Sequence, residues 1–202
     1  MIEKRISQSL SDYLEFDSNE IFVDKSNLIR VFGGAIRDII SNDPINDIDV
    51  LCGSRSLNFV ESILEKNGYY FSDILNGKDI QSMYQDTHVI NEPHTWIKGK
   101  KIVQLIRPSI GTTQNYEAGF NDLISNVDLS CCGVSFDGFK LYEDYPNSIL
   151  HCKMGVFSVN TKAKMYSQNR VHHRINKMVK RGWIEIENTL EANRDLKIKS
   201  LV

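Results

Sequence analysis

The segment 33–49, GGAIRDIISNDPINDID, carries two features that can do chemistry together. Gly33 and Gly34 have no Cβ, so the backbone can turn tightly there and the amide groups of a following helix can meet a polyphosphate. Asp47 and Asp49 are two residues apart, and in an extended strand such side chains leave the same face. Adjacent carboxylates repel each other, and Mg²⁺ is an ion that such a pair can hold together with substrate phosphates. The segment therefore predicts a phosphate cradle beside a magnesium site, the minimum for nucleotidyl transfer.

Local signals predict the elements that position these residues. The apolar pair Val31-Phe32 reads as the end of a strand, the residues after the glycines read as a short helix, and Asp43-Pro44 breaks that helix. The same signals predict strands over 27–32, 46–52, 86–91, 101–106 and 129–136, and helices over 34–41, 56–67 and 114–124. This order is typical of an α+β fold: a mixed or antiparallel sheet with helices on one face, followed by a short C-terminal helical appendage.

The spacing in the first segment resembles the GG-x-[VI]-R-D…D-[IL]-D signature of the polymerase-β-like nucleotidyltransferases, specifically the head domain of bacterial-type CCA-adding enzymes and poly(A) polymerases. The matching positions are Gly33, Gly34, Ile36, Arg37, Asp38, Asp47 and Asp49. The resemblance implies a palm-like head that moves an NMP from an NTP to a hydroxyl, such as a tRNA-like 3′ end. One or two Mg²⁺ ions would be held by Asp47 and Asp49. Arg37 would bind a phosphate oxygen, and Asp38 would orient Arg37 or cap the helix.

A second, less complete match lies at residues 126–137, NVDLSCCGVSFD, which align with the family segment RRDFTINALAYD. Asp128 takes the place of the family's aspartate, and the resemblance implies that it lies near the ribose of the nucleotide. Asn126 and Val127 stand where the family has two arginines. Cys132 stands where it has an asparagine.

Two features of the family have no clear counterpart. The superfamily often carries a third carboxylate on a later strand, whereas the segment 101–107 offers only Gln104 at its centre, an amide that is a poor metal ligand. The base-reading EDxLRxLR segment is also missing, and Arg170 with Arg174 only echoes it. Two alternatives therefore stay open: a catalytically impaired protein that binds nucleotide or RNA, and an enzyme that transfers the NMP to a protein hydroxyl.

Charge is distributed unevenly along the 202 residues. Residues 1–150 contain 13 Lys and Arg against 22 Asp and Glu, whereas residues 151–184 contain eight Lys and Arg and no acid. We expect a nucleotidyltransferase head over 1–150 and a basic helical appendage, an abbreviated neck, over 151–202. A basic segment on an acidic protein indicates that the segment binds a polyanion, because neutralisation of phosphates supplies most of the non-specific affinity for nucleic acid. The alternative is that the segment is a helix face that is only exposed to solvent. The expected nucleic-acid contacts are Lys164, Arg170, Arg174, Lys177 and Lys180.

The composition, with 41% hydrophobic and 25% charged residues, predicts an ordinary soluble protein, and the following features predict that it is cytoplasmic. No apolar run approaches the roughly 20 residues of a membrane span, and the N-terminus is amphipathic and acidic instead of signal-like. The four cysteines have no C-x-x-C spacing, so buried free thiols are expected at Cys52, Cys131, Cys132 and Cys152. An alternative, without a recognised zinc spacing, is a metal site built from His151, Cys152, His172 and His173.

Overall fold

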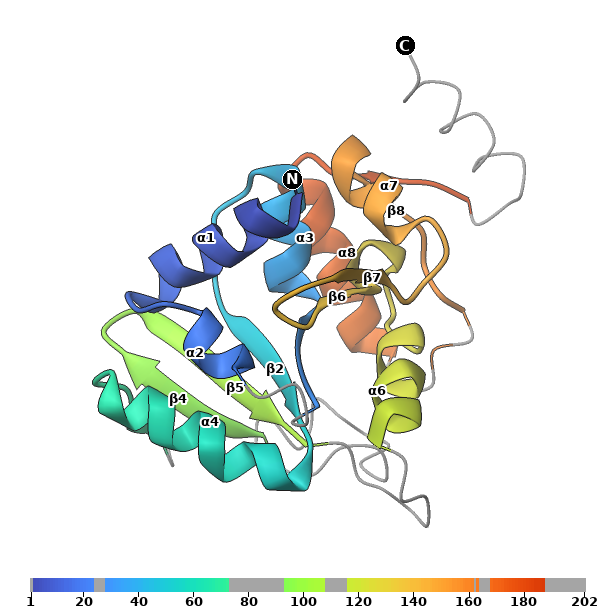
Figure 1. Cartoon of the computed structure of the whole chain (residues 1–202). Coiled ribbons are helices and arrows are strands. Elements are labelled where there is room, and N and C mark those ends of the chain that lie inside the picture. Colours follow the sequence, from blue (N-terminus) through green and yellow to red (C-terminus); the bar gives the residue numbers. More distant parts are fainter. Residues whose placement is uncertain are drawn as a thin grey trace.

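The structure is a computed structural model that describes residues 2–23, 28–72, 93–107, 116–161, 163 and 168–187 (Figure 1). The strands are β1 (Ile29–Phe32), β2 (Ile48–Cys52), β3 (Tyr70–Phe71), β4 (His94–Lys98), β5 (Lys101–Ile106), β6 (Val134–Phe136), β7 (Leu141–Glu143), β8 (Val156–Phe157) and β9 (Ile184–Glu185). The α-helices are α1 (Ile2–Leu14), α2 (Asn19–Phe22), α3 (Gly34–Ser41), α4 (Ser54–Lys66), α6 (Tyr116–Ser125), α7 (Ser148–Met154) and α8 (Gln168–Lys180), and η1 (Ser130–Cys132) is a 3₁₀ turn.

A seven-stranded sheet forms the centre, in the order β3-β4-β5-β2-β1-β6-β7. β2 and β5 run parallel, and the other neighbouring pairs of this sheet are antiparallel. β8 and β9 form a separate parallel pair. This mixed, mostly antiparallel sheet with packed helices confirms the predicted α+β class. Among the helices described, none has both the length and the hydrophobicity that a bilayer crossing requires.

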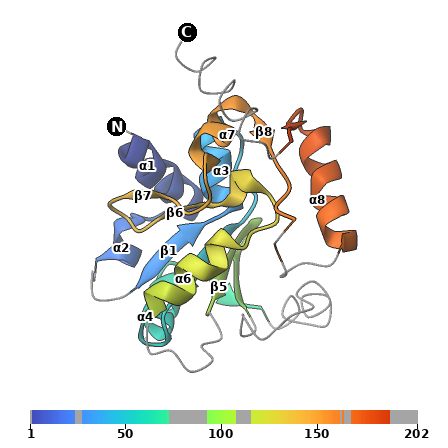
Figure 2. The same ribbon diagram turned by 90° about the vertical axis from the view of Figure 1, so that its right-hand side faces the viewer.

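Alternate residues of the central strands enter apolar clusters on opposite faces of the sheet. Val31 and Val50 belong to the larger cluster, with apolar residues of α1, α2, α3 and α4. Phe32 and Leu51 belong to a smaller cluster with apolar residues of α6. Because successive strand residues point to opposite faces, Asp49 shares the α6 face with Leu51. Figure 2 shows this side of the molecule, with α6 lying in front of β1.

The expected single strand over 129–136 is wrong, because η1 interrupts it and only Val134–Phe136 forms β6. The cause is tertiary. The Ser130 N–H donates to the carbonyl of Ser158 at 2.9 Å, and the Gly133 N–H donates back to the Ser130 carbonyl at 3.0 Å, so the backbone leaves the sheet before β6 begins. β6 then forms an antiparallel hairpin with β7.

Of the two strands expected over 86–91 and 101–106, the described residues confirm the second. β5 (Lys101–Ile106) forms as predicted, but its hairpin partner is β4, which contains Trp96 within the strand. The predicted first strand, 86–91, lies outside the described residues.

The expected domain boundary at residue 150 falls inside α7. His151 and Cys152 of this helix are buried, and Cys152 belongs to the larger apolar cluster together with Met178 of α8 and Trp183. The first residues of the expected appendage are therefore part of the core of the head. Residues beyond α7 enter the same cluster, among them Phe157 of β8, so this part of the expected appendage also packs onto the head.

Gly133 lies where there is no room for a side chain. A Cβ on it would overlap the Cβ of Tyr145 and lie 3.1 Å from the Tyr145 backbone nitrogen. Extra volume in a packed site forces backbone shifts, so we expect Gly133→Ala to lower the free energy of unfolding by about 3 kcal/mol, measured by urea denaturation. The control is Gly99→Ala, because a Cβ there meets nothing within 4 Å and only the φ of +60° is strained, at a cost of about 1 kcal/mol. Equal losses in the two variants would contradict this packing.

Candidate active site

The diglycine connects the end of β1 to the start of α3. Gly33 has a φ of +71°, a conformation that glycine adopts without strain. Its N–H donates to the carbonyl of Val134 in β6, and its carbonyl accepts from the Arg37 N–H, both at 3.0 Å. α3 begins at Gly34, and the first amide groups of a helix have no partner within that helix. The turn therefore presents backbone N–H groups as a phosphate cradle requires.

The two aspartates lie beside this turn because β2 pairs with β1. Asp49 is the register partner of Phe32, the last residue before the diglycine. Asp47 is exposed just before β2 begins, whereas Asp49 is half-buried and its Oδ1 is enclosed without a hydrogen-bond partner. Burial and the charge of Asp47 raise the pKa of Asp49 to about 7, against the opposing charges of two α8 arginines. The carboxylates thus interact, as the D-x-D spacing predicts.

Mg²⁺ fits this donor set. The enclosed Oδ1 of Asp49 lacks a donor, and a cation would satisfy it while relieving the repulsion from Asp47. The neighbour of Asp49 on β5 is Gln104, so this strand contributes an amide at the position where the resemblance would place a third carboxylate. In the part of the chain that the structure describes, no group of three or more His, Cys, Asp or Glu side chains is arranged to hold a metal ion. A cation here would take two carboxylates and complete its shell from substrate phosphates and water, as Mg²⁺ prefers.

Arg37 lies beside the diglycine and is held there by two protein groups. Its Nε donates to Asp38 Oδ1 at 2.8 Å, and its Nη1 donates to Cys132 Sγ at 3.3 Å. Its Nη2 lies 3.6 Å from the position that a Cβ on Gly34 would take. The buried guanidinium is therefore fixed at the turn instead of extending into solvent. Asp38 contacts Arg37 as expected, while phosphate binding by Arg37 stays a prediction.

Asp128 is a fully buried carboxylate between α6 and η1. Nη1 of Arg174, on α8, lies 3.2 Å from Asp128 Oδ1, and neither carboxylate oxygen accepts a well-formed hydrogen bond. Burial raises the pKa of Asp128, and the charge of Arg174 opposes that rise. The ribose contact implied for Asp128 stays a prediction, and a ribose there would compete with Arg174.

The basic residues predicted to bind nucleic acid do not share one surface. Lys164 lies outside the described residues. Arg174 points into the head, where its Nη2 donates to Cys132 Sγ at 3.3 Å. Arg170 is half-buried, and its charge opposes the rise in pKa of both Asp49 and Asp128. Lys177 and Lys180 are exposed, so these two lysines fit a contact with a polyanion without any rearrangement.

Arg181 is a functional candidate that the sequence reasoning missed. It directly follows α8, and its Nη2 donates to Asp38 Oδ1 and to Asp43 Oδ2, both at 2.9 Å. It lies seven residues after Arg174, which corresponds to about two helical turns. This spacing could have indicated from the sequence that Arg174 and Arg181 lie on the same side of the helix. The end of α8 is therefore fixed to the middle of α3 and to the segment that follows α3, close to Arg37.

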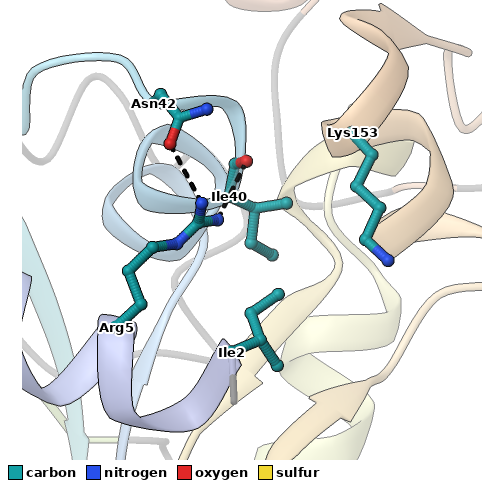
Figure 3. A pocket seen from close by; sticks show the side chains of 5 residues that line it. All are labelled: Ile2, Arg5, Ile40, Asn42 and Lys153. Carbon is teal, nitrogen blue, oxygen red and sulfur yellow. Dashed lines mark hydrogen bonds between the residues drawn. The ribbon is translucent and has the colours of Figure 1, made fainter.

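A separate pocket lies at the C-terminal end of α3 (Figure 3). It has a volume of about 490 Å³ and is lined by Ile2, Arg5, Ile40, Asn42 and Lys153. Arg5 donates to Asn42 Oδ1 at 3.0 Å and to the carbonyl of Ile40 at 3.2 Å. The guanidinium therefore satisfies a carbonyl in the last turn of the helix, and we assign it to structure.

The four cysteines are buried and free, as expected. The alternative metal site is not assembled. His151 Nδ1 hydrogen-bonds with Ser130 Oγ at 2.7 Å inside the core, whereas His172 is exposed on α8 and its Nδ1 lies 2.9 Å from the carbonyl of Gln168.

Solved structures share this fold. A CCA-adding enzyme in complex with ATP matches with a TM-score of 0.60 at 14% identity, over 96% of this chain and 42% of that one. The Thermotoga maritima CCA-adding enzyme in complex with tRNA gives the same score and identity, over 97% of this chain and 44% of that one. The Bacillus stearothermophilus CCA-adding enzyme in complex with CTP gives 0.50 at 11% identity, over 90% and 41%. No family model matches the sequence, and no curated protein sequence matches it.

The chain therefore shares the fold of these CCA-adding enzymes, which agrees with the fold that the sequence resemblance implied. It spans less than half the length of these solved proteins. At 11 to 14% identity this likeness defines the fold alone.

Proposed function

We propose that this chain is a Mg²⁺-dependent nucleotidyltransferase that moves an NMP from an NTP to a hydroxyl at an RNA 3′ end. The observation that carries the proposal is the register of β1 and β2. The diglycine directly follows Phe32, whose partner across the sheet is Asp49, so a phosphate cradle and a carboxylate pair lie side by side. The solved neighbours include complexes with ATP, CTP and tRNA, which supports NTP and RNA as ligands of this chain.

Each part of the site has a role in this reaction. The amide groups of Gly34 and the residues after it at the start of α3 bind the triphosphate, Gly33 shapes the turn that presents them, and Arg37 donates to a phosphate oxygen. Asp47 and Asp49 hold one or two Mg²⁺ ions. Bound Mg²⁺ supplies charge neutralisation at the phosphates and lowers the pKa of an attacking hydroxyl. The paired strands fix the cradle relative to the carboxylates, so the reacting groups are held in position before reaction.

The phosphate cradle can be tested at Gly34 without disturbing the fold. A Cβ there would meet nothing closer than Arg37 Nη2 at 3.6 Å, an ordinary contact, and alanine favours a helix over glycine. A phosphate bound to the backbone amides would need the same space. We expect Gly34→Ala to keep the wild-type melting temperature and to bind NTP about tenfold more weakly by isothermal titration calorimetry. Gly99→Ala, at the β4–β5 turn, should leave affinity unchanged; unchanged affinity in Gly34→Ala as well would refute the cradle.

The RNA contact can be tested on the exposed face of α8. If Lys177 and Lys180 each neutralise one RNA phosphate, the double variant Lys177→Glu/Lys180→Glu should flatten the slope of log affinity against log salt by about 1.4 to 1.8. NTP affinity should stay near wild type. The control reverses two exposed lysines elsewhere, Lys4→Glu/Lys100→Glu, and should leave the slope unchanged. A wild-type slope in the α8 variant would mean that this face is only solvated.

The activity itself is tested by incubating the protein with each labelled NTP, Mg²⁺ and a total RNA pool, followed by a denaturing gel. Label on RNA that depends on Mg²⁺ supports the proposal. Label on protein would favour a protein hydroxyl as the acceptor. NTP binding without pyrophosphate release would favour the impaired binding protein, which the amide of Gln104 beside Asp49 also favours.

A further inference from the structure

A continuous chain of side-chain contacts joins α8 to the head. We call it the α8 network, and its members are, in order, Arg181, Asp38, Arg37, Cys132, Arg174 and Asp128. The successive distances are 2.9, 2.7, 3.3, 3.3 and 3.2 Å. Three guanidiniums thus alternate with two carboxylates and one sulfur. Because α8 contributes Arg174 and the residue after α8 is Arg181, both ends of the network connect the appendage to the head.

Cys132 occupies the centre of the α8 network, and only 1% of it is exposed. Burial raises the pKa of the other three thiols, those of Cys52, Cys131 and Cys152. The pKa of Cys132 is instead held well below its ordinary value, by a hydrogen bond with Cys131 and by the charges of Arg37 and Arg174. The titratable and charged groups that act on it are Cys131, Cys152, Arg37, Arg174, Asp49 and Asp128.

We propose that Cys132 is a positioning residue of the NTP site, whose sulfur binds the guanidiniums of Arg37 and Arg174 together and so links the docking of α8 to the orientation of Arg37. The inference rests on the proposed function, because that function assigns Arg37 to the triphosphate. It concerns a residue that is particular to this chain, since the family it resembles has asparagine at this position.

The geometry of a guanidinium explains why the sulfur matters. The planar group has five N–H donors in fixed directions, so two acceptors on different edges fix its orientation. Asp38 takes one edge of Arg37, and Cys132 takes Nη1. Without the sulfur, Arg37 loses the acceptor on its second edge and can turn away from the diglycine. Arg174 likewise loses the sulfur as a hydrogen-bond acceptor, which weakens the attachment of α8.

Three variants test this inference: Cys132→Ala, Cys132→Asn and, as the matched control, Cys52→Ala, which removes an equally buried thiol from the strand that bears Asp49. The first measurement is the ultraviolet absorbance of thiolate at neutral pH. We expect it in the wild type and in Cys52→Ala, and we expect both Cys132 variants to lose it. The second is hydrogen exchange of the α8 amides, which should be about tenfold faster in Cys132→Ala and unchanged in the control.

The third measurement is NTP affinity. Loss of one charge-assisted hydrogen bond should weaken binding by Cys132→Ala about tenfold. Cys132→Asn keeps a neutral acceptor, so it should recover part of that loss. It also keeps the test decisive if the alanine variant does not fold.

The inference is overturned if the wild type shows no thiolate absorbance, or if both Cys132 variants keep wild-type α8 exchange and NTP affinity. A wild-type protein that binds no NTP overturns the proposed function instead. The absorbance and exchange measurements then decide by themselves whether Cys132 holds α8 to the head.

Discussion

Replacing Asp49 or Asp47 by asparagine is expected to lower the rate of NMP transfer by at least about 10³-fold. A neutral amide is a poor ligand for a hard cation, so the variants lose charge stabilisation that is needed in the transition state. The measurement is the initial rate with saturating Mg²⁺, NTP and RNA. The control is Asp12→Asn on the exposed face of α1, which should keep full activity. Full Mg²⁺-dependent activity in both variants would show that Asp47 and Asp49 are not needed for the reaction.

The same Asp49→Asn change should stabilise the protein when a chelator is present. The pKa of Asp49 is about 7 in the folded protein, against an ordinary value of 3.8, so its ionised form disfavours folding. The wild type therefore loses stability as the pH rises from about 4 through 7, and the variant does not. We expect a gain of about 1 kcal/mol above pH 8, or roughly 2 to 4 °C in melting temperature. A gain that is the same at pH 5 and pH 8 would contradict the repulsion.

The segment 33–49 could be predicted from sequence because its signals are local. Glycines mark the turn, Asp43-Pro44 ends the helix, and alternation marks the strand, so each bound lies within two residues of the structure. α7 could not be predicted in this way, because core contacts satisfy its polar residues. The hydroxyl of Ser148 donates to the carbonyl of Gly133 at 2.8 Å, and His151 pairs with Ser130. These partners are far from α7 in the sequence, so no local pattern around α7 indicates them.

The candidate site could be predicted only where it is contiguous in sequence. The diglycine, Arg37 and the aspartates belong to one stretch and one strand pair. Other members of the site come close to that stretch only after folding. Cys132 contacts Arg37, Arg174 contacts Cys132, and Arg181 contacts Asp38. Helical periodicity places Arg170, Arg174 and Lys177 at neighbouring positions on one side of α8, so it does not say which of these side chains meets the head. The buried acids of the head decide that.

Arg174→Ala should lower the free energy of unfolding by about 3 kcal/mol, because it leaves the fully buried carboxylate of Asp128 without its counterion. Lys177→Ala, one turn further along α8 and exposed, should change it by less than about 0.5 kcal/mol. Urea denaturation at neutral pH measures both. Burial already raises the pKa of Asp128, and removing Arg174 raises it further. A buried protonated carboxyl destabilises the folded protein less than a buried carboxylate does. The decrease in the free energy of unfolding caused by Arg174→Ala should therefore become smaller as the pH falls toward 4 and larger as the pH rises.

A double-mutant cycle identifies the partner. Asp128→Asn removes the buried charge, so adding it to Arg174→Ala should restore part of the stability that the single variant loses. The amide is neutral and similar in size, so the recovery reports on charge more than on packing. If Arg174→Ala instead keeps wild-type stability at every pH and flattens the salt dependence of RNA binding, Arg174 faces nucleic acid as the sequence alone suggested. In that case α8 docks on the head through Arg181 and the apolar contacts of Met178, and Asp128 is left for the nucleotide.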